Sequence, residues 1–380
     1  AVGGRVRTDI VDGFRLDWGF QVLQTAYPEA QRQFDYDALR LKPFYSGALV
    51  RFDGRFHRLA DPFRHLLDAT GTILSPIGTF KDKLRVAKLR SELINSSLAD
   101  LFARDEMTTM EALRDRYHFS ENIIERFFRP FFGGIFFDPA LQTSSRMFDF
   151  VFRMFALGDT ALPAEGMEAL PRQLAAALPP AALRLGHRAD AVEEGGVRLH
   201  SGEVLSARAV VVATDAPAAQ ALADADAPAA HHATTCLYYA ASASPHDEPI
   251  LVLNGDGEGP INNVAVLTDA APSYAPEGQT LISVTVLGDP DLPDERLETR
   301  VRGHLADWYG AEVGTWRHLR TYRVRYALPA LPPPRLDPPE RPVRLGGGRY
   351  VCGDHRATAS IQGALRSGRH AAEAILADLA

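Results

Sequence analysis

The stretch 350–376, near the end of the chain, constrains the fold most. It starts as a short apolar strand, passes through Gly353-Asp354 and a loop, and continues as a segment with helical periodicity. Ser360 is the expected N-cap of this helix. Apolar residues recur there at the spacing of one helix face, namely Ile361, Ala364, Leu365, Ala372, Ile375, Leu376 and Leu379. A strand, an acid and a helix start in this order predict a site for an anionic, ring-bearing cofactor.

Two glycines interrupt the helical pattern. Gly363 and Gly368 stand where glycine lowers helix stability. A glycine early in a helix often marks the close approach of another group. We therefore expect something to lie against the start of this helix.

Composition narrows the class of protein. With 380 residues, two domains are expected, and 46% hydrophobic content is ordinary for a globular chain. A net charge of -7 argues against nucleic-acid binding driven by bulk charge. No run of about 18 apolar residues and no signal peptide is visible, so a cytoplasmic protein is expected.

Metal and thiol chemistry is not indicated. Cys236 and Cys352 are far apart and fit neither a metal nor a redox spacing. The adjacent pair His231-His232 faces two directions, which makes it a poor metal site. We therefore predict no metal and assign no catalytic acid or base.

Turn signals and periodicity alternate along the chain. Asp12-Gly13 and Asp53-Gly54 predict two hairpins, and Phe14 to Phe20 alternates like a half-buried strand. The period is helical from 62 to about 157, with Ser120 as an expected N-cap. Extended runs follow over 187–192, 197–200, 209–213, 235–240, 250–253, 264–267, 280–286 and 319–326, helices over 170–178 and 296–308, and a proline-rich connector over 328–342.

This order predicts an α/β fold with two interleaved domains. The run 209–213 is continuously apolar, as in a buried strand of a parallel or mixed sheet. One domain would comprise residues 1–25, 163–232 and 343–380, in the manner of a two-part Rossmann-like domain. The other, with mixed sheet and helices, would comprise 26–162 and 233–342.

Two further stretches have alternative interpretations. The aromatic run from Phe127 to Phe137, continued by Phe148 to Phe155, is either plain core or the wall of an apolar ligand cavity. The spaced glycines of Asn254 to Gly259 imitate a phosphate-binding loop. Because a strand pattern and not a helix follows them, we predict a hairpin loop.

Three separated stretches together resemble the flavin-containing amine oxidase superfamily, which includes protoporphyrinogen oxidases and carotenoid desaturases. The likeness extends over nearly the whole chain. The stretches are Gly3-Gly4-Arg5 with Asp12-Gly13-Phe14 and Asp17-Trp18-Gly19; Val210 to Thr214 preceded by His187 to Val192; and Gly353-Asp354 with Ser360 to Arg369.

The resemblance implies an enzyme that binds FAD in the discontinuous domain. Arg5 would lie near the FAD phosphates, with Gly4 allowing close approach of the backbone. Gly19, Phe20 and Gln21 would approach the flavin ring. Ala189 would give main-chain contacts to the adenine.

The closing stretch would hold the flavin end of the same cofactor. Gly353 and Asp354 would bind the ribityl or phosphate region. Ile361, Gln362 and Ala364 would place a helix N-terminus against the N1–C2=O edge of the flavin. Reduced flavin carries negative charge at that edge, and helix N-terminal N–H groups stabilise negative charge.

The chain also departs from the pattern of the superfamily. The first strand, glycine-rich turn and helix of the family should precede Gly3, yet the given sequence begins Ala1-Val2-Gly3 without a Met. We expect an N-terminal truncation and weak or absent FAD binding by the chain as given. A remnant or scaffold that lost its cofactor is the non-enzyme alternative.

The class of substrate is indicated by residues that amine oxidases of the superfamily have and this sequence lacks. Amine oxidases of the superfamily place a Lys near flavin N5, but no Lys follows Lys88, and the loop 355–359 lacks an aromatic pair. We therefore favour hydride removal from a large apolar, carotenoid- or isoprenoid-like substrate over an amine oxidase or a protoporphyrinogen oxidase-like enzyme.

The lysines are clustered. Lys81, Lys83 and Lys88 lie on one expected helix with Leu84, Leu93 and Leu98, and only Lys42 lies elsewhere. Such a segment is either a solvated helix face, the more common case, or a basic amphipathic helix at a membrane surface. The alternative to a purely cytoplasmic protein is thus a peripheral membrane contact through 81–102.

Overall fold

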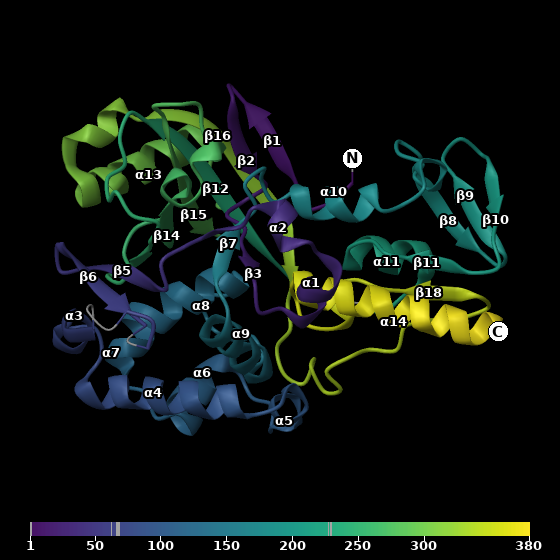
Figure 1. The fold of residues 1–380 in the computed structure, drawn as a ribbon, viewed down its shortest axis with the longest axis horizontal. Helices are drawn as coiled ribbons and strands as arrows, with labels where there is room; N and C mark the ends of the chain where they lie inside the picture. Colours follow the sequence, from purple (N-terminus) through teal and green to yellow (C-terminus); the bar gives the residue numbers. More distant parts are fainter. Residues whose placement is uncertain (1, 62, 66–68, 227, 229) are drawn as a thin grey trace.

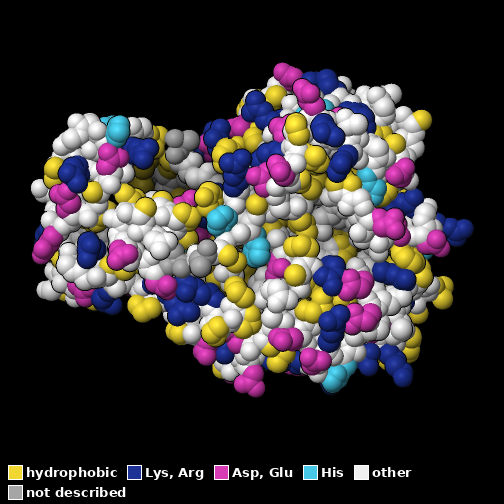
Figure 2. Space-filling model, turned by 180° about the vertical axis from the view of Figure 1, so that it is seen from behind, with side chains coloured by type: hydrophobic (Ala, Val, Ile, Leu, Met, Phe, Trp, Pro, Cys, Tyr) yellow, Lys and Arg dark blue, Asp and Glu magenta, His cyan; other side chains and the backbone are white. Residues whose placement is uncertain are grey.

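The computed structural model describes residues 2–61, 63–65, 69–226, 228 and 230–380. A larger body, on the left in Figure 1, carries a long sheet with helices beneath it, and a smaller lobe projects on the right. From behind, the surface is hollowed between the lobe and the body (Figure 2). The helices, strands and their interleaving confirm the predicted α/β class.

One mixed sheet of seven strands organises the larger body. Its order is β16-β12-β15-β14-β13-β5-β6, antiparallel except between β13 and β5. The strands are β5 (Gly47–Phe52), β6 (Arg55–Ala60), β12 (His231–Ala241), β13 (Leu251–Asn254), β14 (Asn263–Val266), β15 (Thr280–Leu287) and β16 (Arg317–Pro329). Segments 47–60 and 231–329 therefore share one sheet, although most of the helical block separates them in sequence.

Four small sheets build the rest. They are β1-β2, β3-β7-β4, β10-β9-β8 and β11-β18-β17, and only β11 and β18 pair in parallel in this last sheet. The strands are β1 (Thr8–Val11), β2 (Phe14–Asp17), β3 (Leu23–Gln24), β4 (Lys42–Pro43), β7 (Thr160–Leu162), β8 (Ala189–Glu193), β9 (Gly196–Leu199), β10 (Val204–Ser206), β11 (Val210–Val212), β17 (Arg344–Gly346) and β18 (Arg349–Val351).

The helical block lies below the long sheet in Figure 1. Two of its segments, Ala112–Arg116 and Ile124–Phe128, are π-helical turns that widen the helices they continue. Its α-helices are α3 (Ala69–Leu74), α4 (Phe80–Asn95), α5 (Leu98–Ala103), α6 (Thr109–Glu111), α7 (Glu121–Ile123), α8 (Arg129–Phe136) and α9 (Ser145–Leu157). The predicted beginning of the block, at residue 62, falls outside the described residues.

The remaining helices join the parts. Helix α14 underlies the smaller lobe and points its N-terminus toward the larger body (Figure 1). These helices are α1 (Pro28–Gln33), α2 (Tyr36–Leu39), α10 (Ala169–Ala176), α11 (Ala216–Ala223), α12 (Leu267–Ala270), α13 (Asp294–Tyr309) and α14 (Ile361–Leu379).

Turn chemistry positions these elements as the sequence predicts. Asp12 and Asp53 adopt φ of 50°, each followed by a left-handed glycine, in the β1-β2 and β5-β6 hairpins. The Asn254–Gly259 segment joins antiparallel β13 and β14, so the hairpin-loop prediction is confirmed. Ser360 accepts a hydrogen bond from the N–H of Gly363, so it caps α14 as expected.

Local predictions of burial were wrong at Asp17 and Val211, and the predicted N-cap Ser120 is right in position only. The strand from Phe14 ends at Asp17, whose side chain is buried although the alternation predicted an exposed one. Val211 is 38% exposed, because side chains alternate along β11 and its side chain lies on the uncovered face, opposite to Val210 and Val212. Ser120 stands at the N-cap position, but its hydroxyl donates to Asp82 instead of capping α7.

The aromatic run forms packed core. Phe128, Phe132, Phe136 and Phe148 are almost fully buried, and the rings of Phe132 and Phe148 lie 4.6 Å apart. Rings from α8, α9 and the π-helical turn before α8 interlock, as expected for aromatic core. Other rings of the set remain half-buried: Phe127, Phe131, Phe152 and Phe155.

Candidate functional site

Residues from both ends of the chain meet where β18 ends. Arg5 donates from Nη2 to Oδ2 of Asp354 at 2.7 Å and from Nη1 to the carbonyl of Ala327 at 2.6 Å. Gln21 donates from Nε2 to the carbonyl of Arg5 at 2.9 Å. The structure therefore brings together three predicted site residues, Arg5, Gln21 and Asp354, that are up to 349 positions apart.

Hydrogen bonds and a ring contact hold the segment before Gln21 in place. The hydroxyl of Tyr238 donates to the carbonyls of Asp17 and Gly19, at 2.9 and 3.2 Å. Phe20 packs edge-on against Phe44, with ring centroids 6.0 Å apart. Gly19 has a φ of 90°, which glycine adopts readily. These contacts hold residues 19–21 as one ordered turn beside Arg5.

Gly4 lies next to this contact. It has a φ of 57°, and a Cβ added there would meet no atom within 4 Å. Its surroundings are thus open, which is compatible with the predicted approach of a ligand to the backbone.

The N-terminus of α14 lies next to the turn that contains Asp354. Asp354 belongs to the 3-10 turn Asp354–Arg356, which packs on α14. Ser360 uses its hydroxyl oxygen and its carbonyl to accept the N–H groups of Gly363 and Ala364. The N–H groups of Ile361 and Gln362 have no acceptor within the helix, so the positive end of the helix dipole is directed outward here.

Gly363 is needed by the chain itself. A Cβ at this position would lie 1.9 Å from the carbonyl oxygen of Thr358. The group that approaches the start of the helix closely is therefore this loop carbonyl. Gly368 has open space instead, so no close approach explains it.

His355 is the residue that indicates whether the site suits an anionic, ring-bearing group. Its side chain is buried, and both ring nitrogens lack a hydrogen-bond partner among the described residues. Burial lowers the pKa of His355, which favours the neutral ring. Buried polar atoms usually have a partner, so unpaired nitrogens next to Asp354 suit a site that takes up a polar ligand.

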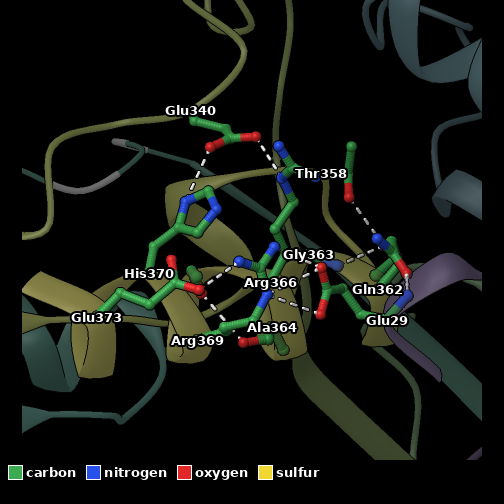
Figure 3. A network of polar contacts seen from close by, with 12 residues as sticks. Glu29, Glu340, Thr358, Gln362, Gly363, Ala364, Arg366, Arg369, His370 and Glu373 are labelled. Atoms are coloured by element: carbon green, nitrogen blue, oxygen red, sulfur yellow. Dashed lines mark hydrogen bonds and ion pairs between the residues drawn. The ribbon is translucent and has the colours of Figure 1, made fainter. Parts of the chain in front are cut away.

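Figure 3 shows a network of charged side chains around α14 that was not predicted from the sequence. The side chain of Gln362 accepts the N–H of Glu29, at the start of α1, at 2.8 Å. The buried carboxylate of Glu29 pairs with Arg369 at 2.7 Å, and this contact lowers the pKa of Glu29. Gln362 and Arg369, seven positions apart on α14, thus fix α1.

A second part of the network borders the connector. Glu340 accepts from Arg366 and pairs with His370 at 2.9 Å. Arg369 also contacts Glu373 (Figure 3). Pro28 followed by Glu29 is a helix-start signal, which could have predicted α1 from the sequence.

Ala189 lies in another part of the fold from Arg5, Gln21 and Asp354. It begins β8, in the three-stranded sheet of the smaller lobe, and its register partner is Leu199. Helix α11 packs on β8, and Val192 joins the small apolar cluster around Val212 and Val351. Its predicted contact with adenine stays a prediction.

Neither of two cavities on the surface is lined by the predicted site residues. One, of about 600 Å³, lies between residues 340–344 and α14. The other, of about 720 Å³, lies between the 256–260 loop and α13. Within the described part of the chain, no three His, Cys, Asp or Glu side chains are placed to hold a metal ion, and no helix is both long and apolar enough to cross a bilayer.

Comparison with protein families gives one match. The family described as flavin containing amine oxidoreductase matches residues 1–376. A search of curated proteins gives no significant match.

Solved structures share the fold at low sequence identity. A candidate protoporphyrinogen oxidase from Exiguobacterium sp. 255-15 superposes with a TM-score of 0.73 at 19% identity, over 100% of this chain and 91% of that one. Putrescine oxidase bound to putrescine gives 0.68 at 16% identity, over 99% and 91%. Reduced UDP-galactopyranose mutase gives 0.68 at 16% identity, over 100% and 88%.

Proposed function

This chain belongs to the flavin containing amine oxidoreductase family, whose members are FAD-dependent oxidoreductases, and on that premise we propose where its FAD binds and what it oxidises. The flavin end of FAD lies against the start of α14, beside Asp354 and residues 19–21. The observation that carries this proposal is the meeting of Arg5, Gln21 and Asp354 in front of that helix.

Each group there has a distinct task. The N–H groups of Ile361 and Gln362 stabilise negative charge on a ring placed at the helix start. Asp354 accepts hydrogen bonds from ligand hydroxyls, while Arg5 offsets its charge near phosphate. Residues 19–21 position the ring by contact. FAD, when bound, accepts the hydride that leaves a C–H bond of the substrate.

The binding proposal is tested by titrating FAD into the protein while flavin fluorescence is recorded. Asp354→Ala removes a buried hydrogen-bonding carboxylate and should weaken binding about tenfold or more. Asp378→Ala is the matched control, because Asp378 forms an Asp–Arg pair with Arg344 at the opposite end of α14. Equal affinity of Asp354→Ala and wild type, or an equal loss in the control, would contradict the proposal.

For the substrate, we propose a large apolar molecule of isoprenoid character. No lysine follows Lys88, so the lysine typical of amine oxidation is absent. The loop 355–359 is buried and contains no Phe, Tyr or Trp. The half-buried rings of Phe127 and Phe131, stacked 5.3 Å apart, pack on β5 and β13 and keep part of their apolar surface exposed.

Flavin bleaching under anaerobic conditions distinguishes the substrate classes. A polyene, a porphyrinogen and putrescine are each mixed with the FAD-loaded protein, and loss of flavin absorbance is followed. We expect the polyene to bleach the flavin and putrescine to leave it oxidised. Fast bleaching by putrescine would overturn the apolar assignment, and bleaching by the porphyrinogen alone would favour a protoporphyrinogen oxidase-like enzyme.

A further inference from the structure

Four large apolar side chains project into solvent from one short stretch. Ile73, Leu74, Phe80 and Leu84 are 50, 83, 62 and 57% exposed. Single exposed apolar residues are common, but four within twelve positions form a patch that needs an explanation. In Figure 1 they come from the end of α3 and the start of α4, at the edge of the helical block farthest from the smaller lobe.

Buried residues on the inner side of this segment fix the outward direction of the patch. Between α3 and α4, Ile77 is fully buried against β5 and β13, and a Cβ on Gly78 would press on Ile123 at 3.0 Å. Leu89 and Leu93 face the core from the inner side of α4. The segment is therefore held tightly by its inner residues, and Phe80 and Leu84 occupy the outer stripe of α4, at i and i+4.

The two helices present one surface. Lys83 donates from Nζ to the carbonyls of Ile73 and Ser75, at 2.7 and 2.9 Å. This contact satisfies carbonyls at the end of α3 and joins them to α4. The end of α3, with Leu74, and the start of α4, with Phe80, therefore lie next to each other.

The charge around the patch is positive. Residues 69–91 contain Lys81, Lys83, Arg85, Lys88 and Arg90 but a single acid, Asp82. Asp82 is fully buried, where it accepts hydrogen bonds from Thr79 and Ser120. Lys81 and Lys88 are exposed beside the apolar side chains. Hydrophobic and basic side chains lie together along the lower right edge of Figure 2, where this region lies.

We propose that this patch, Ile73, Leu74, Phe80 and Leu84 with Lys81 and Lys88, docks the protein on an anionic membrane surface. Protruding apolar side chains with lysines at their rim match the boundary between lipid headgroups and acyl chains. A positive patch on a chain of net charge -7 also orients the molecule toward anionic lipid. The surface is independent of the FAD site, so its test needs neither cofactor nor substrate.

Co-sedimentation with vesicles tests the docking. Vesicles of phosphatidylcholine with phosphatidylserine should retain the wild type, and phosphatidylcholine alone should retain much less. Phe80→Gln with Leu84→Gln should lower binding about tenfold or more, because two exposed apolar side chains are lost. Lys81→Gln with Lys88→Gln should lower binding to the anionic vesicles roughly tenfold and weaken its salt dependence.

Leu376→Gln is the matched control, since Leu376 is an even more exposed apolar residue, at 72%, on α14. Thermal unfolding should be the same in all variants because the changed side chains lie outside the core. Failure of the wild type to sediment with anionic vesicles at low salt overturns the proposal. Equal losses in Leu376→Gln and in Phe80→Gln with Leu84→Gln do so as well.

A second copy of the chain is the competing occupant of the patch. Light scattering decides between the two. A wild-type dimer that Phe80→Gln with Leu84→Gln converts to a monomer would replace membrane docking by self-association. A mass that is the same in wild type and variant, together with the expected loss of vesicle binding, supports docking on lipid.

Discussion

The two parts of the molecule are held together by different forces. The larger body closes around a seven-stranded sheet and an extensive aromatic core. The part predicted to hold FAD is assembled from three separate segments, with small sheets and a small apolar cluster around Val212 and Val351. The ion pair of Arg5 with Asp354 joins two of its pieces, and the pair of Arg369 with Glu29 ties it to the segment 26–162 of the other part. The aromatic core of the body also takes in Phe14, Leu16, Leu23, Met167 and Leu170 of the second part. Burial therefore stabilises both parts, and the second part depends more on polar contacts and, we expect, on its ligand.

The largest effect should come from the aromatic core of the body. Phe148→Ala removes a fully buried ring that contacts Phe128 and Phe132, and should lower the free energy of unfolding by about 3–5 kcal/mol. Val351→Ala, in the small cluster, should cost about 2 kcal/mol. Urea denaturation of both variants checks this order. A larger loss of unfolding free energy in Val351→Ala than in Phe148→Ala would contradict this comparison of the two parts.

Asp17 connects the two parts and should make stability depend on pH. Burial raises its pKa to about 6, although Thr8, Met167 and Tyr274 donate to it. The folded state therefore holds this proton more tightly than the unfolded state, whose value is 3.8. The stability gained from Asp17 is complete below pH 4 and is lost as the pH rises through 6.

Asp17→Asn isolates this contribution, because the amide keeps the size of the side chain and does not titrate. Between pH 4 and 7, the wild type should lose roughly 1–3 kcal/mol of unfolding free energy relative to Asp17→Asn. Urea titrations at several pH values measure the difference. If the unfolding free energies of the two proteins change in parallel with pH, the pKa of Asp17 is the same in the folded and unfolded states, which contradicts the prediction.

A smaller effect of opposite sign is expected where α14 of the predicted FAD-binding part contacts α1. Arg369 lowers the pKa of Glu29, so the stability from this pair is present above pH 4.5 and is lost as the pH falls. Glu29→Gln should cost about 1–2 kcal/mol at pH 7, because it removes a charge from a buried, hydrogen-bonded pair. Asp378→Asn, which weakens an exposed pair with Arg344, should leave the midpoint of urea unfolding unchanged. Equal shifts in both variants would remove the distinction between the pairs.

Local rules predicted a large share of the fold. Asp-Gly turns located the hairpins at Asp12 and Asp53, and Ser360 located the start of α14, because each depends on a few neighbouring residues. The spacing of Gly353, Asp354 and Ser360 also identified the segment around which the candidate site forms. Fold class followed from the order of strand and helix patterns.

Contacts between distant segments were not predictable in the same way. Nothing near Gln362 in the sequence indicates that its side chain holds α1, 333 positions away. The exposure of Val211 depends on which face of β11 other elements cover, and the burial of Asp17 depends on Tyr274 and Thr8. Periodicity describes one element at a time, so it does not contain this tertiary information.

The structure of the protein with FAD bound tests the central claim most directly. The account predicts the flavin ring at the start of α14, with its N1–C2=O edge facing the N–H groups of Ile361 and Gln362, and Asp354 within hydrogen-bond distance of the cofactor. Flavin bound elsewhere, for example in the cavity between the 256–260 loop and α13, would contradict it.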